Sequence, residues 1–478
     1  MMKSIHSTGS NPSIKLNMLM NVLLTLSSIL IPVITLPYVT RVLGAEGVGR
    51  VYFASSVVAG FAMFAELGIP VYGIRACARV RDDRRELSRT VREIMMINLI
   101  SCVIVYTVFA VMIRTVPRFT EDRLLLTIMS STMILNCIGA EWLYKAVEKY
   151  TYITVRSLTF KFIALIAMFV MVRDESDYVI YGAITIFAVS ASNIINLCSI
   201  HRYADLRPTG RHDLARHLPG MLMLFALAAA TTIYTNLDLA ILDFMKGDAE
   251  AGLYGVAVKI KLVIVSLVTS VSAVLLPRNS FYYEKNRKDE FYGLISRTMG
   301  AVLTVSLPVL IYFIIFARES ISVLAGDGFS GAVAPMMIIM PSVAFIGVSN
   351  IIGIQMLVPA GREKTVVTAA MIGAAVDLIL NLILIPGYAS SGAAAATLAA
   401  EICVTGYMLY AVRDRLSELF SHIPVKGILT ALAGVLAAGL LIKQSSSGAF
   451  TTLCISSICC FGIYSLIMYL YGRRDRSR

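Results

Sequence analysis

The chain contains many runs of about 20 residues with almost no charged side chain, and this pattern restricts what it can fold into. A hydrocarbon core about 30 Å thick requires about 20 mostly apolar residues in each helix that crosses it. Fourteen runs meet this requirement: 18–40, 50–69, 94–113, 124–144, 157–172, 178–200, 218–243, 253–276, 298–316, 332–357, 366–386, 392–411, 427–442 and 450–471. We therefore predict an all-α polytopic membrane protein with about 14 transmembrane helices.

The overall composition excludes several other classes of protein. Hydrophobic residues make up 57% of the 478 residues and charged residues only 15%, against about 25% in an ordinary globular protein. A soluble fold of this length could not hide so much apolar surface. The eight cysteines form no C-x-x-C pair, which argues against a disulfide scaffold or a zinc site. The net charge of +12 is spread among short connections, so it indicates no nucleic-acid partner.

The distribution of Lys and Arg predicts how the helices are oriented. With a cytoplasmic N-terminus, the inner segments hold 30 of the 42 Lys and Arg residues and the outer connections hold 9. An excess of positive charge on the cytoplasmic side is the rule in membrane proteins. The even number of spans then places both termini in the cytoplasm.

A short motif occurs twice, each time between a helix that leaves the cytoplasm and one that returns. It reads Gly44-Ala-Glu-Gly-Val-Gly49 after the first span and Gly247-Asp-Ala-Glu-Ala-Gly252 after the seventh. The copies lie 203 residues apart, an interval of six spans, so the repeats run parallel, as in many two-lobed transporters. Chance turn chemistry is the alternative explanation. We predict an N-terminal lobe at 1–210, a C-terminal lobe at 211–415 and two additional spans at 416–478.

The sequence carries none of the common catalytic motifs. All five histidines lie in the N-terminus, in cytoplasmic connections or at span ends, and no H-E-x-x-H, G-x-S-x-G or P-loop pattern occurs. We predict that the protein is not an enzyme, holds no metal or other cofactor and does not hydrolyse ATP. An ion gradient, the membrane potential or downstream consumption would supply the energy, with proton or sodium as the coupling ion.

Acidic side chains inside the spans mark candidate functional positions, because a charge within the bilayer is costly. Asp377 and Glu401 lie near the middle of neighbouring spans. For both, a role in a wet cavity or in proton coupling competes with a structural hydrogen bond to a neighbouring helix. Asp238 follows Asn236 in a polar patch late in the seventh span, and it is the acidic residue that we would change first.

Three basic residues also lie inside spans. Lys161 is in the fifth span, from which a long side chain can extend to the cytoplasmic interface. Lys259 and Lys261 occupy the outer half of the eighth span and, two residues apart on a helix, point to different sides. We expect one of them to face a central lumen and the other to pair with Asp238 or Asp243.

Five stretches, spread in order over nearly the whole chain, carry a resemblance to a known family. They are LPYVTRVLGAEGVG at 36–49, EWLYKAVEKYTYITVR at 141–156, IYTNLD at 233–238, GREK at 361–364 and NLILIPGYASSGAA at 381–394. On these stretches the chain resembles the bacterial oligosaccharide flippases. They form the polysaccharide-transport branch of the superfamily that also includes multidrug antiporters and the lipid II flippase.

The resemblance implies two six-helix lobes, a final helix pair and alternating access. The implied substrate is an oligosaccharide repeat unit on undecaprenyl diphosphate, moved from the inner to the outer leaflet of the bacterial cytoplasmic membrane for cell-surface polysaccharide synthesis. Membrane lipid is an implied partner, and a glycan polymerase or another envelope-assembly protein is a further candidate. The cationic candidates for the lumen are Arg41, Arg75, Lys161 and Lys259. The polar or coupling candidates are Asn236, Asp238, Asp377 and Glu401.

Other functions stay open at this point. An ion-coupled multidrug antiporter on the same fold would need an apolar cavity and a coupling carboxylate, which Asp377 or Glu401 would supply. Lipid II or a teichoic-acid precursor is an alternative lipid-linked substrate. A membrane-embedded polymerase or ligase is disfavoured because the outer connections are short and carry no histidine. A structural scaffold for glycan assembly would tolerate the loss of charges in the lumen.

Overall fold

The computed structural model describes residues 14–207, 213–421, 423–444 and 448–476, and within these ranges all regular elements are helices. The N-terminal part forms α1 (Ile14–Glu66), α2 (Ile69–Arg79), α3 (Arg84–Thr115), α4 (Pro117–Glu121), α5 (Arg123–Gly139), α6 (Glu141–Ala146), α7 (Tyr150–Met171), α8 (Tyr178–Ser190) and α9 (Ser192–Ser199). The rest forms α10 (Leu218–Lys246), α11 (Asp248–Glu284), α12 (Lys288–Ile315), α13 (Ala317–Ala325), α14 (Val333–Ile339), α15 (Ser342–Asn350), α16 (Glu363–Ala411), α17 (Leu416–Phe420), α18 (Val425–Lys443) and α19 (Ala449–Arg476). The predicted all-α fold is confirmed.

The helices have the length and apolar character needed to cross a membrane. Ten helical segments of the described chain pass this test, and one bent pair raises the number to eleven. The bent pair, Asp327–Ile339 and Ser342–Leu357, turns by 45° and coincides with the predicted span 332–357. The shorter apolar α5 coincides with the predicted span 124–144. The chain is therefore a multi-pass membrane protein.

Two long helices are interrupted by a residue with positive φ, so each covers two predicted spans. In α1 the break is at Gly44 (φ 65°, ψ −176°). In α16 it is at Ala389 (φ 46°, ψ −128°). Gly247, which separates α10 from α11, has φ 87° and ψ 177° and thus nearly the conformation of Gly44. That region of backbone space is open almost only to glycine, which explains the residue type at both turns.

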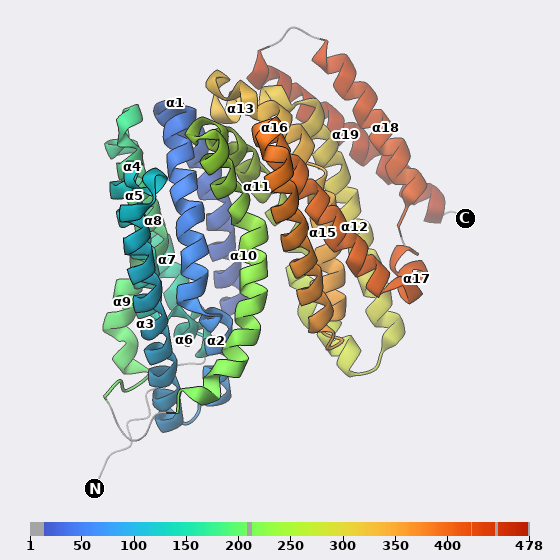
Figure 1. Cartoon of the computed structure of the whole chain (residues 1–478). Helices are drawn as coiled ribbons and strands as arrows, with labels where there is room; N and C mark the ends of the chain where they lie inside the picture. Colours follow the sequence, from blue (N-terminus) through green and yellow to red (C-terminus); the bar gives the residue numbers. More distant parts are fainter. Residues whose placement is uncertain (1–13, 208–212, 422, 445–447, 477–478) are drawn as a thin grey trace.

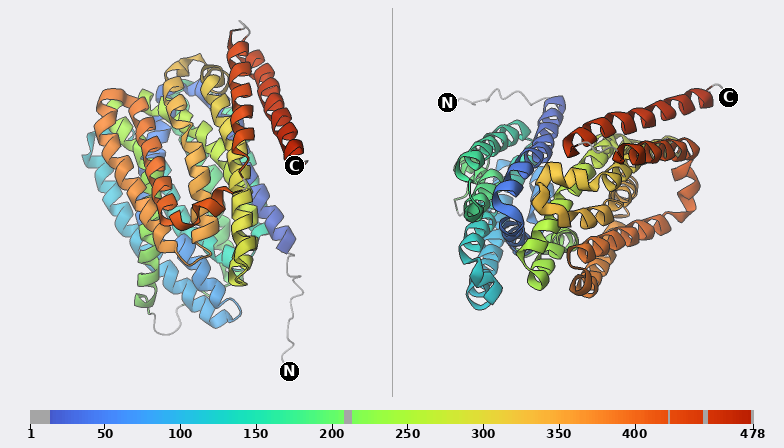
Figure 2. Two further views of the ribbon diagram at one scale, coloured as in Figure 1. Left: turned by 90° about the vertical axis from the view of Figure 1, so that its right-hand side faces the viewer. Right: turned by 90° about the horizontal axis from the view of Figure 1, so that it is seen from above.

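The helices form two bundles that lie side by side, with a further pair outside them (Figure 1). We call α1 to α9 the first bundle and α10 to α16 the second bundle. They meet where α1 packs against α10 and α11, and α10 packs in turn against α16. The pair α18 and α19 contacts α12 and α13 of the second bundle. Seen from above, this pair lies away from the first bundle (Figure 2).

The side chains are distributed as in a protein solvated by lipid. Large apolar side chains stay exposed on the outer faces, for example Ile104 on α3, Ile166 on α7 and Ile458 on α19. Polar side chains such as Glu93 and Asn381 are buried between helices instead. Lipid tails are as apolar as leucine, so an apolar exterior carries no penalty in a bilayer.

Candidate functional site

A cavity of about 720 Å³ lies within the first bundle and reaches its border with the second. Its wall comes mainly from α1, α5, α7 and α8, and α11 of the second bundle contributes Lys259. The polar lining residues include Ser27, Ser28, Asn136, Glu141 and Lys161. Apolar side chains fill the space between them, so the cavity has a few polar groups set in an apolar wall, as ligand sites usually do.

Two of the predicted cations, Lys161 and Lys259, both line this cavity although they come from different bundles. The Lys161 Nζ on α7 donates hydrogen bonds to the hydroxyls of Ser28 at 2.7 Å and Ser27 at 3.1 Å. The Lys259 Nζ lies 5.5 Å from the centre of the Tyr52 ring on α1, within the range of a cation–π contact. The cavity wall therefore carries one ammonium group from each bundle.

The other two predicted cations, Arg41 and Arg75, link the bundles outside this cavity. The Arg41 guanidinium donates to the carbonyl oxygens of Ser322 (3.3 Å) and Val323 (2.7 Å) near the C-terminal end of α13. The Arg75 guanidinium on α2 lies 3.8 Å from a carboxylate oxygen of Glu363 at the start of α16. Each arginine thus joins the first bundle to the second.

The predicted acidic residues cluster inside the second bundle. A carboxylate oxygen of Asp238 accepts a hydrogen bond from the Tyr254 hydroxyl, which lies 2.9 Å from the Thr397 hydroxyl. The break at Ala389 divides α16 into two halves, and both contact α10. The carbonyl of Pro386 in the first half accepts a hydrogen bond from Lys246, and the Thr397 hydroxyl in the second half lies 3.5 Å from a carboxylate oxygen of Asp238. Asp377 and Glu401, one on each half, are 1% and 3% exposed.

The lysines two residues apart on α11 do separate, as their spacing predicts. Lys259 lines the cavity, whereas Lys261 is buried and interacts electrostatically with Asp238 and Asp377. Asp243, the alternative partner that we considered for a lysine, pairs with an arginine instead. A positive charge among several carboxylates lowers the cost of burying them.

Asn236 lies where α10 touches α1 rather than on the cavity wall. Its backbone carbonyl accepts a hydrogen bond from the Ser56 hydroxyl on α1. Its side-chain amide donates to the Thr235 hydroxyl at 2.8 Å. The residue therefore contributes to the junction of the two bundles.

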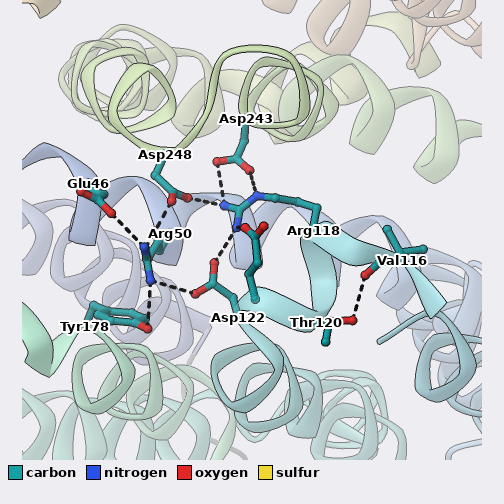
Figure 3. Close-up of polar contacts among 10 residues, drawn as sticks. Glu46, Arg50, Val116, Arg118, Thr120, Asp122, Tyr178, Asp243 and Asp248 are labelled. Atoms are coloured by element: carbon teal, nitrogen blue, oxygen red, sulfur yellow. Dashed lines mark hydrogen bonds and ion pairs between the residues drawn. The ribbon is translucent and has the colours of Figure 1, made fainter. Parts of the chain in front are cut away.

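Charged residues of both bundles form a compact cluster at the end where α10 turns into α11 (Figure 3). Arg118, on α4 of the first bundle, contacts Asp243 at 2.8 Å, Asp122 at 3.0 Å and also Asp248. Arg50 contacts Asp248 at 3.2 Å and Asp122 at 3.5 Å. We call these five residues the charged cluster. It closes this end of the contact between the bundles with charge-assisted pairs, the stronger class of hydrogen bond.

Burial and pairing oppose each other in the charged cluster. Burial raises the pKa of Asp122 above its ordinary value, although Arg118 and Arg50 work against this. Burial also disfavours the charge on Arg118, but its hydrogen bond to Asp243 and the nearby carboxylates keep the pKa of the guanidinium above its ordinary value. The ion pairs thus keep these side chains charged, whereas burial alone would favour their neutral forms.

The repeated motif forms a symmetric contact beside the charged cluster. A Cβ atom built on Gly49 would lie 1.8 Å from the carbonyl oxygen of Asp248, and one built on Gly252 would lie 2.0 Å from that of Ala45. Ala45 and Asp248 directly follow Gly44 and Gly247, so they occupy equivalent positions in the two copies. The contact is therefore reciprocal, as across a two-fold axis.

Sequence reasoning did not single out most of the charged cluster. Arg50, Arg118, Asp122 and Asp248 lie in or beside connections, where charged residues are usually only solvated. One signal was present, because Arg50 directly follows Gly49 of the repeat and Asp248 directly follows Gly247. The repeat thus marked the place, although it did not reveal the partners.

The comparisons with known proteins agree with the resemblance read from the sequence. A curated relative from Escherichia coli (strain K12), named "Putative O-antigen transporter", is 24% identical over 390 residues, which cover 81% of this chain and 94% of that protein. The solved structure of the lipid II flippase MurJ, in an inward closed conformation, has a TM-score of 0.74 at 17% identity and covers 96% of this chain and 100% of its own. An inward-facing multidrug resistance transporter of the MATE family has a TM-score of 0.64 at 11% identity, and the match covers 84% of this chain and 96% of that transporter.

The two structural similarities concern the fold alone, and the family assignment comes from the sequence. The family model described as "Polysaccharide biosynthesis protein" matches residues 14–282, which is more than half of the chain. This match includes the cavity, Lys259 and all five residues of the charged cluster. The chain belongs to the polysaccharide biosynthesis protein family.

Proposed function

We propose that the protein is a flippase for lipid-linked oligosaccharides. Its substrate would be an oligosaccharide repeat unit on undecaprenyl diphosphate, moved from the inner to the outer leaflet of the bacterial cytoplasmic membrane for cell-surface polysaccharide synthesis. The observation that carries the proposal is the cavity in which Lys161 of one bundle and Lys259 of the other face the same space. Two ammonium groups match the charge of a diphosphate.

Physical chemistry explains why such a substrate needs a protein. Moving a hydroxyl group into hydrocarbon without a hydrogen-bond partner costs roughly 2–7 kcal/mol, and even a short glycan carries many hydroxyls. The diphosphate adds charge to that barrier. A cavity with polar groups lowers both costs, while the lipid tail stays in the bilayer.

The same proposal includes the topology. We propose fourteen crossings with both termini in the cytoplasm, an N-terminal lobe at 1–210, a C-terminal lobe at 211–415 and an additional pair at 416–478. Alternating access would arise when the lobes rock about the contact between α1, α10 and α11. The charged cluster would then hold the outer end closed while the cavity is open to the cytoplasmic leaflet.

Energy coupling would take place in the buried acidic cluster of the second lobe. Asp238, Asp377 and Glu401 supply carboxylates, and Thr397 supplies a hydroxyl, so either a proton or a sodium ion suits the chemistry there. The protein would act without a bound cofactor and without covalent chemistry on its substrate. A glycan polymerase or another envelope-assembly protein is the expected partner.

An ion-coupled multidrug antiporter is the principal alternative, because the MATE-family transporters have the same fold. Such antiporters export amphiphilic cations, whereas this cavity carries two lysines against one carboxylate, Glu141. That balance of charge favours an anionic substrate. A precursor such as lipid II is also anionic, so the experiment must identify the glycan.

The test is to deplete the protein in its host and to find the leaflet in which lipid-linked oligosaccharide accumulates. An impermeant glycan label would be applied to intact cells and to inverted vesicles, and mass spectrometry would identify the labelled lipid. Accumulation on the cytoplasmic side, reversed on re-expression, is the expected result. Normal export of the glycan together with increased sensitivity to cationic drugs would instead favour the antiporter.

A further inference from the structure

A second cavity, of about 580 Å³, lies on the outer side of the first bundle, between α7 and α9. We call it the lateral groove. Its wall includes Lys149, Thr151, Tyr152 and Arg156 near the start of α7, together with Ile195 of α9. α9 lies at the outer edge of the first bundle (Figure 1). The lateral groove is therefore separate from the cavity that contains Lys161 and Lys259.

Arg156 is the unusual residue of the lateral groove. Its side chain is only 4% exposed. One terminal nitrogen lies 3.3 Å from a carboxylate oxygen of Glu141, and the guanidinium carbon lies 5.6 Å from the centre of the Tyr152 ring. Its Nε and its other terminal nitrogen are buried without a hydrogen-bond partner among the residues that the structure describes. Buried donors of a charged group are costly to leave unpaired, which points to a ligand that completes them.

A neighbouring donor has the same property. The Thr151 hydroxyl, in the first turn of α7, is also buried without a partner in the described part of the chain. The helix start directs free N–H groups and a positive dipole to the same region, and α7 is 22 residues long. An anionic oxygen in the lateral groove would satisfy the Thr151 hydroxyl and the Arg156 guanidinium together.

The charge around the lateral groove is in excess positive. Arg156 shares the carboxylate of Glu141 with Lys145, whose Nζ lies 2.8 Å from it. Lys149 adds another positive charge on the wall. Glu148 also lines the groove, but its carboxylate is paired with Arg81 at 2.7 Å. A negatively charged ligand would therefore be attracted to the groove.

The wall beside these donors is apolar and continuous with the lipid-facing surface. Val155 and Ile195 line the lateral groove and are themselves exposed. Ile166 and Val170 continue the exposed apolar face along α7, and Ile194 does so on α9. A ligand with a phosphate at one end and acyl chains at the other fits this arrangement, in which basic donors lie next to a lipid-facing apolar surface.

We propose that the lateral groove binds an anionic phospholipid of the surrounding bilayer. The phosphate would accept hydrogen bonds from the Arg156 guanidinium and the Thr151 hydroxyl, and the acyl chains would lie along α7 and α9. The orientation proposed above puts the start of α7 on the cytoplasmic side, where basic pockets between helices bind anionic headgroups. The phosphate of the bound lipid would neutralise the charge of Arg156. Arg156 contacts Glu141, and Glu141 in turn lines the central cavity.

The experiment measures which lipids the purified full-length protein retains, so it does not depend on flipping. The protein would be placed in nanodiscs of phosphatidylcholine with a minor share of phosphatidylglycerol, and retained lipid would be counted by native mass spectrometry. The variants are Arg156→Gln, which removes the charge, and Ile195→Trp, which fills the groove and keeps the charge. Arg287→Gln is the matched control, because Arg287 is an exposed cation paired with Glu290 in the second bundle.

We expect the wild type and Arg287→Gln to retain phosphatidylglycerol over phosphatidylcholine, and both groove variants to bind it at least tenfold more weakly. Ile195→Trp keeps the proposal testable if Arg156→Gln unfolds. Equal retention of phosphatidylglycerol by Ile195→Trp and the wild type would overturn the proposal. A wild type that retains phosphatidylcholine as well as phosphatidylglycerol would also overturn it. Undecaprenyl diphosphate added at the same concentration serves as the competing probe. Its preferential capture would assign the groove to the transported lipid instead.

Discussion

The Arg118 guanidinium of the first bundle holds both carboxylate oxygens of Asp243 in the second, at 2.8 and 3.1 Å. A two-point contact of this kind fixes the orientation of both groups as well as their distance. Asp243 is buried, so the pair is shielded from water and ions. This contact therefore restricts the relative position and orientation of the two bundles at this end.

Asp243→Asn is expected to weaken closure at this end. Removal of one partner from a buried ion pair costs about 3–5 kcal/mol when the other charge is left alone. Arg118 keeps Asp122 and Asp248 in this variant, so we expect a smaller cost. Spin labels at Arg123 and Lys246, in a cysteine-free background, would report the separation of the bundles. We expect a longer and broader distance distribution in Asp243→Asn. Glu418→Gln, which breaks the exposed pair with Arg415, is the control, and an equal shift there would contradict the assignment.

The effect of losing Arg118 should depend on pH. Burial raises the pKa of Asp122, and Arg118 is the first of the charges that lower it. In Arg118→Gln that opposition is lost, so the Asp122 pKa in the closed state should lie further above its value in an open, hydrated state. A group whose pKa is raised on closing favours closure as the pH falls through that pKa.

The bundles of Arg118→Gln should therefore separate at neutral pH and approach again as the pH is lowered. Asp243, Asp248 and Arg50 face the same site, so Asp122→Asn in the Arg118→Gln background isolates the contribution of Asp122. The same label pair measures it. A pH response that is unchanged by Asp122→Asn would rule this explanation out.

Gly49→Ala should be far more damaging than the same change elsewhere on α1. A Cβ at position 49 would meet the backbone of Asp248 at 1.8 Å, and backbone cannot move aside as a side chain can. Overpacking costs typically about 1–3 kcal/mol and more where nothing yields. Gly60→Ala is a close control, since a Cβ there would meet nothing within 4 Å. Thermal unfolding and the label distances would both be compared, and equal effects of the two changes would refute the close contact.

Lys161→Gln and Lys259→Gln should each reduce glycan export. A hydrogen bond to a charged group contributes about 1.5–3 kcal/mol, so each loss should lower transport roughly tenfold to a hundredfold. Polymer output at matched protein levels is the measurement, with Lys285→Gln as an exposed control. Export that is unchanged in either variant would remove that lysine from the substrate path. Arg41→Gln, by contrast, should act through its contacts with α13.

The double variant Asp377→Asn, Glu401→Gln tests the coupling proposal. If these carboxylates carry the coupling ion, transport into vesicles should lose its response to an imposed proton or sodium gradient. A slow, gradient-independent exchange should remain, because the cavity lysines are intact. Parallel assays with each gradient alone identify the ion. Transport that still responds fully to both gradients would exclude these residues.

The long apolar runs were enough to predict an all-helical membrane protein, because each span must be apolar over its own length. The separation of Lys259 from Lys261 followed in the same way from local helix geometry. The position of Asp377 and Glu401 near the middle of neighbouring spans was also visible in the sequence. Each of these features depends on residues that are close together in the sequence, so the local sequence is enough to predict it.

The contact between Arg118 and Asp243 is of another kind. The two residues are 125 positions apart and meet only because the bundles dock as whole bodies. Arg41 shows the same limit, since its carbonyl partners lie on α13, 281 and 282 residues away. No local sequence pattern predicts contacts between residues so far apart. Only the repeated glycine motif indicated where the two bundles dock.

The reciprocal glycine contact has a consequence for how fast the bundles can part. Backbone lies directly on backbone there, so closure orders no side chain and loses little rotamer entropy. The apolar surface that opening uncovers comes from the side chains around the glycines, such as Leu43 and Val48 of α1 against Leu242 and Val256 of the second bundle. The glycine contact is thus nearly neutral by itself, and the strength of the joint comes from the apolar side chains and the charges around it. Evolution could therefore adjust the lifetime of the closed state through single ionic substitutions, without rebuilding the surface on which the two halves meet.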